Sequence, residues 1–242
     1  MHSPLLPIRR FLREFRVAIE AVLCPACCPG CGAASPSLCA PCRVLLVRRP
    51  PPLCARCGEP VPAGARCTAD HSPWVGLRWV RAPFRYRGTA GAIVRRLKFR
   101  RDPEALAYLS RALAEAARDL PGEALRRARI LSVPLHPEKL RRRGFDQAQA
   151  LAQGLAERLR AEWVPGALVR LRATLPQADP RVTSRSDNVA GAFAVARPKA
   201  LSGRMVLLVD DVTTSGATAR ECARVLHAAG VAAVALLTAA RS

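Results

Sequence analysis

The stretch Met205-Val-Leu-Leu-Val-Asp210-Asp211-Val-Thr-Thr-Ser-Gly216-Ala-Thr218 decides the fold of this 242-residue chain. Residues 205–209 form an apolar run of strand length, and two adjacent carboxylates follow it. A hydroxyl-rich turn comes next, and the pattern then predicts a helix that Gly230 ends as a C-terminal cap. A buried strand, a polar loop and a helix are typical of the ligand-binding edge of an open α/β sheet.

Each part of this stretch has a use in binding a phosphorylated sugar. Helix N-termini offer unpaired N–H groups to a phosphate, and Gly216 lets the backbone approach closely. Asp210 and Asp211 can accept hydrogen bonds from sugar hydroxyls, or hold Mg²⁺ directly or through water. Capping of the helix explains one hydroxyl, but neither the acids nor the glycine. The absence of a Gly-Lys-Ser/Thr ending excludes a P-loop. The hydroxyl donors are Thr214, Ser215 and Thr218.

Outward from this stretch, strand and helix signals alternate from about residue 76 to the C-terminus. The expected strands are 77–86, 130–135, 168–171, 205–209 and 231–237, and the expected helices are 88–99, 103–120, 145–160 and 216–229. Continuous apolar strands alternating with helices predict a mostly parallel α/β sheet covered by helices on both faces. We therefore expect a small cysteine-rich domain at 1–75 and an α/β domain at 76–242.

The charge is strongly basic, with 39 Lys and Arg against 18 Asp and Glu, for a net charge of +21. A surplus this large favours polyanionic partners such as phosphates or nucleic acid, with a passive basic surface as the alternative. No apolar run approaches the ~20 residues that a membrane helix needs. Near the N-terminus, the apolar segment 17–23 is too short for a signal peptide and contains Glu20. We expect a short amphipathic helix from Phe11 to Leu23 and a cytoplasmic protein without a membrane span.

Nine of the ten cysteines lie between residues 24 and 67. The first four predicted ligands follow a C-x2-C-x7-C-x2-C pattern, whose paired turns suit one tetrahedral zinc ion without an open position for catalysis. Disulfides fit poorly, because the chain shows no export signal. Cys24 and Cys27 form another C-x2-C and compete as ligands, so the grouping stays open. The predicted structural zinc site is Cys28, Cys31, Cys39 and Cys42.

A second, weaker cysteine pattern begins 26 residues after the first and indicates a repeated ribbon. It lacks a fourth cysteine, and His71 is a chemically better substitute than Asp70. This second site is either a further zinc site or a degenerate, empty one. Cys222 stands apart and is expected to pack in the core. The predicted ligands of the second site are Cys54, Cys57, Cys67 and His71.

The strand-acid-loop stretch resembles the 5-phosphoribosyl-1-pyrophosphate (PRPP) motif of type I phosphoribosyltransferases. The resemblance implies that Asp210 and Asp211 contact the ribose hydroxyls and that PRPP enters with Mg²⁺. It also implies that the following loop wraps the 5-phosphate. The residues of that loop are Thr213, Thr214, Ser215, Gly216, Ala217 and Thr218.

A second resemblance covers the chain from about Cys28 to the C-terminus. The zinc-ribbon N-terminus, Leu97-Lys-Phe, Val133-Pro-Leu, Arg143-Gly-Phe-Asp-Gln and Arg185-Ser-Asp-Asn188-Val-Ala-Gly come before the PRPP motif. This order is similar to that of the ComF family of DNA-uptake (competence) proteins. The chain departs from the family's pattern at Asp146, usually Asn, and in lacking the last cysteine of the second ribbon. An acid beside a pyrophosphate would repel it, so Asp146 is expected to point away.

These resemblances imply further site residues. Arg143 and Gly144 resemble the pyrophosphate loop, and guanidinium groups suit a diphosphate. The neighbouring Arg141 and Arg142 are either part of that loop or a solvated basic run. Lys98 and Gln147 are further site residues, whereas His136 is expected to start a helix. The expected mobile lid over PRPP contains Arg172, Gln177, Arg185 and Asn188.

Three functions compete at this point. The first is an enzyme that transfers the phosphoribosyl group of Mg-PRPP to an unidentified acceptor. The second is a single-stranded-DNA-binding factor in natural transformation whose PRPP site is regulatory or a relic. The third is a zinc-dependent docking protein for a competence helicase. For DNA binding, the predicted basic patch is Arg95, Arg96, Arg100 and Arg101, with Phe84, Tyr86 and Phe99 as stacking residues.

Overall fold

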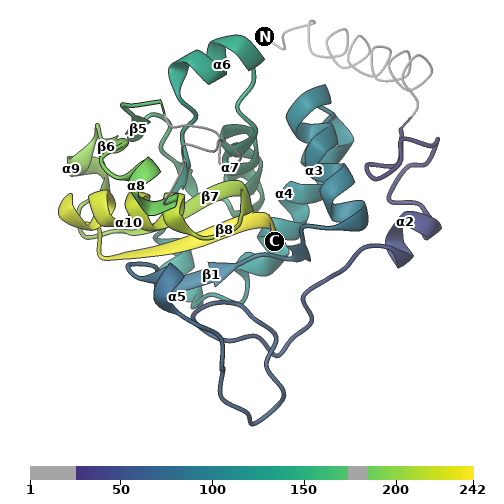
Figure 1. The fold of residues 1–242 in the computed structure, drawn as a ribbon, viewed down its shortest axis with the longest axis horizontal. Helices are drawn as coiled ribbons and strands as arrows, with labels where there is room; N and C mark the ends of the chain where they lie inside the picture. The colour runs from purple at the N-terminus through teal and green to yellow at the C-terminus, as the bar shows by residue number, and fades with distance from the viewer. Residues whose placement is uncertain (1–25, 174–184) are drawn as a thin grey trace, which may run out of the picture.

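The computed structural model describes residues 26–173 and 185–242 (Figure 1). The helix expected from Phe11 to Leu23 and two residues named above, Cys24 and Gln177, lie outside the described residues.

The centre of the fold is a parallel sheet with strand order β1-β8-β7-β3-β4, and β2 also pairs with β8. The mostly parallel α/β sheet is therefore confirmed. The two central strands continue beyond the apolar runs of the sequence, so that Asp210 pairs in register with Thr238. The strands are β1 (Trp79–Arg81), β2 (Phe84–Arg85), β3 (Arg129–Ser132), β4 (Glu162–Trp163), β7 (Met205–Thr213) and β8 (Ala233–Arg241).

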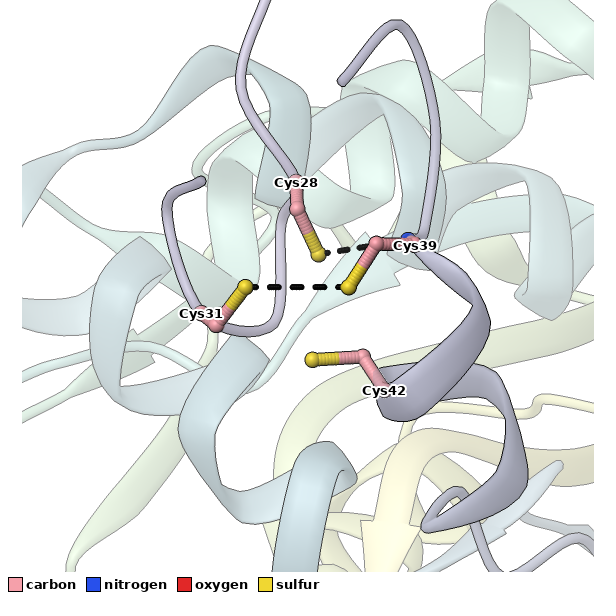
Figure 2. Close-up of side chains that lie close together, drawn as sticks. All are labelled: Cys28, Cys31, Cys39 and Cys42. Carbon is pink, nitrogen blue, oxygen red and sulfur yellow. Dashed lines mark hydrogen bonds between the residues drawn. The ribbon is translucent and has the colours of Figure 1, made fainter. Parts of the chain in front are cut away.

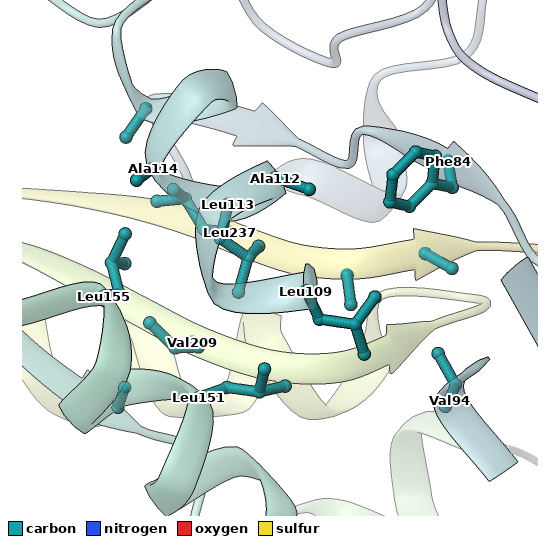
Figure 3. Close-up of a cluster of buried hydrophobic side chains, with 14 of the residues drawn as sticks. Phe84, Val94, Leu109, Ala112, Leu113, Ala114, Leu151, Leu155, Val209 and Leu237 are labelled. Atoms are coloured by element: carbon teal, nitrogen blue, oxygen red, sulfur yellow. The ribbon is translucent and has the colours of Figure 1, made fainter. Parts of the chain in front are cut away.

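One face of the sheet is covered by three long helices: α3 (Gly88–Arg100), α4 (Pro103–Ala117) and α7 (Gln147–Leu159). Leu109 of α4 and Leu151 of α7 meet Val209 and Leu237 of the strands in one buried cluster (Figure 3). Strand residues alternate between faces, so every second apolar residue of β7 and β8 points into this layer. Asp102 begins α4 by accepting hydrogen bonds from the N–H groups of Glu104 and Ala105.

The other face packs against α10 (Ala217–Ala228), with Val206, Leu208 and Leu236 from the strands. Short elements complete this layer: α8 (Arg185–Val189), α9 (Pro198–Leu201) and the antiparallel pair β5 (Leu168–Arg170) and β6 (Phe193–Val195). The strand expected at 168–171 therefore exists, but it lies outside the parallel sheet. Figure 1 shows this pair gathered with α8, α9 and α10 at one end of the molecule.

The cysteine-rich segment shares the core of the α/β region. Cys28, Leu38 and Leu46 belong to the buried cluster that contains α3 and α4. Within the described residues, this segment holds α2 (Ala40–Val44) and the short 3-10 helix η1 (Ser72–Trp74). The division near residue 75 stays a prediction. Two short helices, α5 (Gly122–Arg126) and α6 (Pro137–Arg143), complete the fold.

The single strand expected over 77–86 is split into β1 and β2. Pro83 lies between them, and proline has no N–H to donate to a strand partner. Among the described residues, no helix is both long and apolar enough to cross a membrane.

Candidate functional site

A cavity of about 340 Å³ lies where β7 reaches its carboxyl end. It brings together eight of the predicted PRPP-site residues, namely Lys98, Arg143, Gln147, Asn188, Asp210, Asp211, Thr214 and Thr218. Its other lining residues are Tyr86, Val133, Pro134, Leu135, Lys139, Ala148, Arg170, Val189 and Val212. Segments from α3, α6, α7, β5 and β7 therefore meet at one point. Among the predicted PRPP-site residues whose side chains the structure describes, those outside this lining are Thr213, Ser215, Gly216, Ala217, Gly144 and Arg172.

The two carboxylates differ in their surroundings. Asp211 accepts a hydrogen bond from Gln147 Nε2 at 3.4 Å, and Lys98 Nζ lies 3.9 Å from the same oxygen. Asp210 Oδ1 accepts a hydrogen bond from the N–H of Asp211 at 2.8 Å. Burial raises the pKa of Asp210 well above its ordinary value, and the adjacent Asp211 charge raises it further. Asp210 is thus an acid at the cavity wall whose ionised form needs further hydrogen-bond donors.

Part of the cavity wall is cationic, with Lys98, Lys139, Arg143 and Arg170 in the lining. Burial lowers the pKa of Lys139, and the nearby charges of Arg170, Arg143, Arg142 and Lys98 lower it further. Burial also lowers the pKa of Arg170. The cavity thus gathers several cations whose charges repel one another at Lys139, an arrangement that suits an anionic ligand. Neither Lys139 nor Arg170 is among the site residues predicted from the sequence, because neither belongs to a recognised motif.

The loop after β7 makes a close contact with η1. Gly216 has φ +72°, and a Cβ on it would lie 2.7 Å from the carbonyl oxygen of Pro73 and 2.8 Å from the Trp74 ring. Only glycine fits this approach without a shift of the neighbours. Within the described residues, the buried Ser215 Oγ and Gln147 Oε1 have no hydrogen-bond partner. Of these two residues, Gln147 lines the cavity, where a ligand can complete its contacts, whereas Ser215 lies outside the lining.

Asp146 lies next to the cavity without lining it. Its Oδ1 accepts from the N–H of Gln149 at 3.0 Å and so caps α7, while Oδ2 accepts from the N–H of Leu135 at 3.4 Å. The Asp146 carboxylate therefore accepts hydrogen bonds from local backbone N–H groups. This agrees with the expectation that it does not face a pyrophosphate. An asparagine could make the same cap. His136 caps α6 through Nδ1, which accepts from Glu138 N, so it starts a helix as predicted.

Arg172, the first residue of the segment expected to form a lid, contacts residues near the other end of that segment. Its Nη2 donates to the carbonyl oxygens of Asn188 at 3.3 Å and Ala190 at 2.8 Å. Just beyond Ala190, the N–H of Gly191 donates to Glu221 of α10 at 2.8 Å. Arg185 is the first residue of α8. A lid function for residues 172–188 stays a prediction.

The basic residues expected to bind nucleic acid do not form one free face. Arg96 Nε donates to Asp102 at 2.7 Å, and Arg101 Nη2 donates to the carbonyl oxygen of Arg143 at 2.6 Å. Arg95 and Arg100 are exposed. Their role in DNA binding stays untested.

The three aromatic residues predicted to stack on nucleic acid differ in burial and position. The prediction that Phe84 stacks on nucleic acid bases is wrong, because its ring is fully buried and stacks on Tyr108 with centroids 6.0 Å apart. Tyr86 lines the cavity beside β7, and Phe99 is 68% exposed.

The first cysteine cluster has the predicted membership, Cys28, Cys31, Cys39 and Cys42, with all four sulfurs within 4.8 Å of one another (Figure 2). The Cys31 and Cys39 sulfurs are 3.7 Å apart. Zinc bound tetrahedrally at about 2.3 Å from each sulfur puts neighbouring sulfurs about 3.8 Å apart. Four thiol donors at this spacing fit a structural zinc ion, and these residues could hold one. Cys27 is not part of the group.

The second cluster also has its predicted membership, Cys54, Cys57, Cys67 and His71. The Cys57 and Cys67 sulfurs are 3.7 Å apart, and Cys54 Sγ is 3.6 Å from His71 Nε2. These donors could hold a second structural zinc ion. The cluster is tied to the sheet, because Arg81 of β1 donates to the carbonyl oxygens of Cys54 and Ala55. Cys222, by contrast, is a fully buried core residue, as predicted.

Each cluster contains one thiol whose pKa is lowered, so that it ionises more readily. Burial alone raises the pKa of Cys28, but N–H donors from Cys31, Cys39 and Gly30 outweigh it and lower that pKa to about 6. Backbone donors likewise outweigh burial at Cys54 and lower its pKa to about 6. Burial raises the pKa of Cys42 to about 12 and of Cys57 to about 11. The thiolate is the form that binds zinc.

The sequence has known relatives, although no protein-family model matches it. The chain is 37% identical over 190 residues to the DNA utilization protein YhgH of Escherichia coli, covering 75% of this chain and 81% of that protein. It is 35% identical over 103 residues to Competence protein F of Haemophilus influenzae, covering 42% and 45%. The solved structure of TT1426 from Thermus thermophilus aligns with 57% of this chain and 83% of that chain, at 16% identity and a TM-score of 0.33.

Proposed function

Because the chain belongs to the ComF family, we propose that it binds PRPP with Mg²⁺ beside β7 and transfers the phosphoribosyl group to an acceptor. We further propose that this activity serves DNA utilization. The observation that carries the proposal is the convergence of two adjacent carboxylates, a glycine-containing loop before a helix, and four cations on one cavity of about 340 Å³. This combination matches a ligand with a ribose, a monophosphate and a diphosphate.

The carboxylate wall suits the ribose. Hydroxyl groups donate well to carboxylates, and burial leaves the ionised form of Asp210 in need of such donors. Gln147 donates a hydrogen bond to Oδ2 of Asp211, and Lys98 forms an ion pair with the same oxygen, so both orient the carboxylate. The helix N-terminus of α10 and the hydroxyls of Thr214 and Thr218 suit the 5-phosphate.

The cationic wall suits the diphosphate. In the proposed transfer, the bond between ribose C1 and the diphosphate oxygen breaks with its electron pair leaving on the diphosphate. The acceptor's nucleophile forms the new bond to C1 and afterwards loses a proton. Lys139, Arg143 and Arg170 would stabilise the leaving group, and the carboxylate wall would hold the ribose as positive charge develops on the ring.

Magnesium would enter with the substrate, and its chemistry there is to offset diphosphate charge. The carboxylate oxygens of Asp210 and Asp211 are the hard donors that Mg²⁺ prefers, so they fit a role in holding it directly or through water.

The place of this activity in DNA utilization follows from the relatives, one named a DNA utilization protein and another a competence protein. The net charge of +21 supports contact with nucleic acid and favours a second candidate function. In that alternative the protein binds single-stranded DNA, or docks on a competence helicase, and PRPP regulates it without being consumed.

Calorimetric titration with Mg-PRPP tests the proposal. We expect wild type to bind one equivalent and the pair Asp210→Asn plus Asp211→Asn to lose binding. The matched control is Glu123→Gln plus Glu157→Gln, which removes two exposed acids outside the cavity and should bind like wild type. A folded wild type that takes up no PRPP would refute the proposal. Release of pyrophosphate only when an acceptor is added would separate transfer from regulation.

A further inference from the structure

A second cavity, of about 290 Å³, lies between the first cysteine cluster and α4. One side comes from Ser37, Leu38, Arg43 and Arg48, and the other from Tyr108, Arg111, Ala112 and Glu115. It shares no lining residue with the cavity beside β7. The proposed function uses none of these residues.

Three guanidinium groups from separate segments surround this cavity. Arg43 lies on α2, beside the cluster residue Cys42, and its Nη2 donates to the carbonyl oxygen of Leu38 at 3.2 Å. The guanidinium of Arg48 lies 5.7 Å from the centroid of the buried Phe84 ring. Arg111 projects from α4 and is exposed. Contacts with Leu38 and Phe84 thus position two of the three arginines, and Arg48 also interacts with the Tyr108 hydroxyl.

The cavity has little negative charge of its own to satisfy these arginines. Glu115, one turn after Arg111 on α4, is the sole acid in the lining. Over residues 26–173 and 185–242, no ion pair joins Glu115 to any of the three arginines. The lining therefore carries three positive charges against one negative charge, without internal neutralisation.

Tyr108 adds a fixed polar group to the wall. Its ring stacks on Phe84 with an angle of 15° between the planes, so packing sets its position. Burial raises the pKa of Tyr108, which keeps its hydroxyl protonated and able to donate. A rigid hydroxyl donor among guanidinium groups is a common arrangement around phosphate oxygens.

We propose that this second cavity, lined by Arg43, Arg48, Arg111 and Tyr108, binds a phosphate group carried by a nucleotide. Guanidinium groups recognise phosphate by paired hydrogen bonds, and their weak hydration lowers the cost of bringing them together. The phosphate could belong to a nucleic acid strand or to a free nucleotide. The net charge of +21 favours the strand, because many phosphates respond together to such a field.

Fluorescence anisotropy with a labelled oligo-dT strand tests the proposal. The test variant is Arg43→Gln plus Arg111→Gln. The matched control is Arg118→Gln plus Arg126→Gln, two exposed arginines outside both cavities. Each lost contact with single-stranded DNA lowers the salt slope of log K by about 0.7, which is about 5-fold in affinity near 0.1 M salt. We expect about 25-fold weaker binding for the test pair and little change for the control. Equal losses in both pairs would overturn the proposal.

A second variant covers the case in which loss of Arg43 disturbs α2. Glu115→Gln removes the sole acid of the lining from an exposed position, so we expect tighter oligo-dT binding. Unchanged or weaker binding in this variant would contradict the site.

Competition experiments separate the two sources of phosphate. Competition by dTMP at similar phosphate concentration assigns the cavity to a free nucleotide. Competition by polyglutamate as strong as that by DNA would instead indicate an acidic protein surface and overturn the proposal. Mg-PRPP titration of the same variants should match wild type, which separates this site from the one beside β7.

Discussion

The contact between the β7–α10 loop and η1 makes a quantitative prediction for Gly216→Ala. Alanine at φ +72° costs about 1–2 kcal/mol, because the Cβ crowds the following carbonyl. The same Cβ would lie 2.7 Å from Pro73 O and 2.8 Å from the Trp74 ring, an overpacking that costs a further ~1–3 kcal/mol. We expect urea unfolding to show that the free energy of unfolding falls by about 2–5 kcal/mol in total. Because the same loop and the N-terminus of α10 are proposed to hold the 5-phosphate, displacing the loop should also weaken Mg-PRPP binding.

Gly166→Ala is the matched control for this substitution. Gly166 has φ +68°, and no atom lies within 4 Å of the position that a Cβ would take, so only the backbone cost of about 1–2 kcal/mol applies. The difference between the two variants isolates the contact with η1. If Gly216→Ala unfolds at the same urea concentration as Gly166→Ala, the contact of the loop with η1 does not contribute to stability, and the prediction is wrong.

Three further predictions concern charge. The raised pKa of Asp210 means that the folded state resists its ionisation, so the stability contributed by the protonated acid is lost as pH rises from 3.8 through the raised value. Asp210→Asn should therefore gain stability over wild type across that rise, measured by urea midpoints at acid and neutral pH, and an equal difference at both would contradict this. Zinc uptake at neutral pH should release protons from the Cys42 and Cys57 thiols, whose pKa values are about 12 and about 11. Calorimetry in two buffers of different ionisation enthalpy measures the release, and Cys222→Ser should leave it unchanged. Lys139→Gln should weaken pyrophosphate binding by about 10-fold or more, the loss of one charge-assisted contact of ~1.5–3 kcal/mol, whereas Lys199→Gln, remote from the cavity lining, should not.

Local patterns were enough to predict the centre of the fold. The apolar run 205–209, the acids after it and the glycine before α10 specify a strand, a loop and a helix from residues adjacent in sequence. The cysteine spacing predicted the first cluster for the same reason, because a C-x2-C turn brings its own two sulfurs together. In the second cluster, His71 was predicted from its chemistry as a zinc ligand. Such features depend on few long-range contacts.

The remaining site residues depend on contacts that the sequence does not show. Lys139 and Arg170 reach the cavity only because α6 and β5 converge on the end of β7. Phe84 was misassigned, because an aromatic residue near a basic run resembles a stacking surface until its burial under α4 is known. Arg96 was grouped with free arginines, although Asp102, six residues later, pairs with it.

The most direct test of the PRPP site is a crystal structure of the protein grown with Mg-PRPP. Density for one ligand should fill the cavity beside β7, with the ribose hydroxyls on Asp210 and Asp211. The 5-phosphate should lie on the N-terminus of α10, and the diphosphate should lie on Lys139, Arg143 and Arg170. Density for PRPP elsewhere, or with the diphosphate on the α10 loop, would contradict the account.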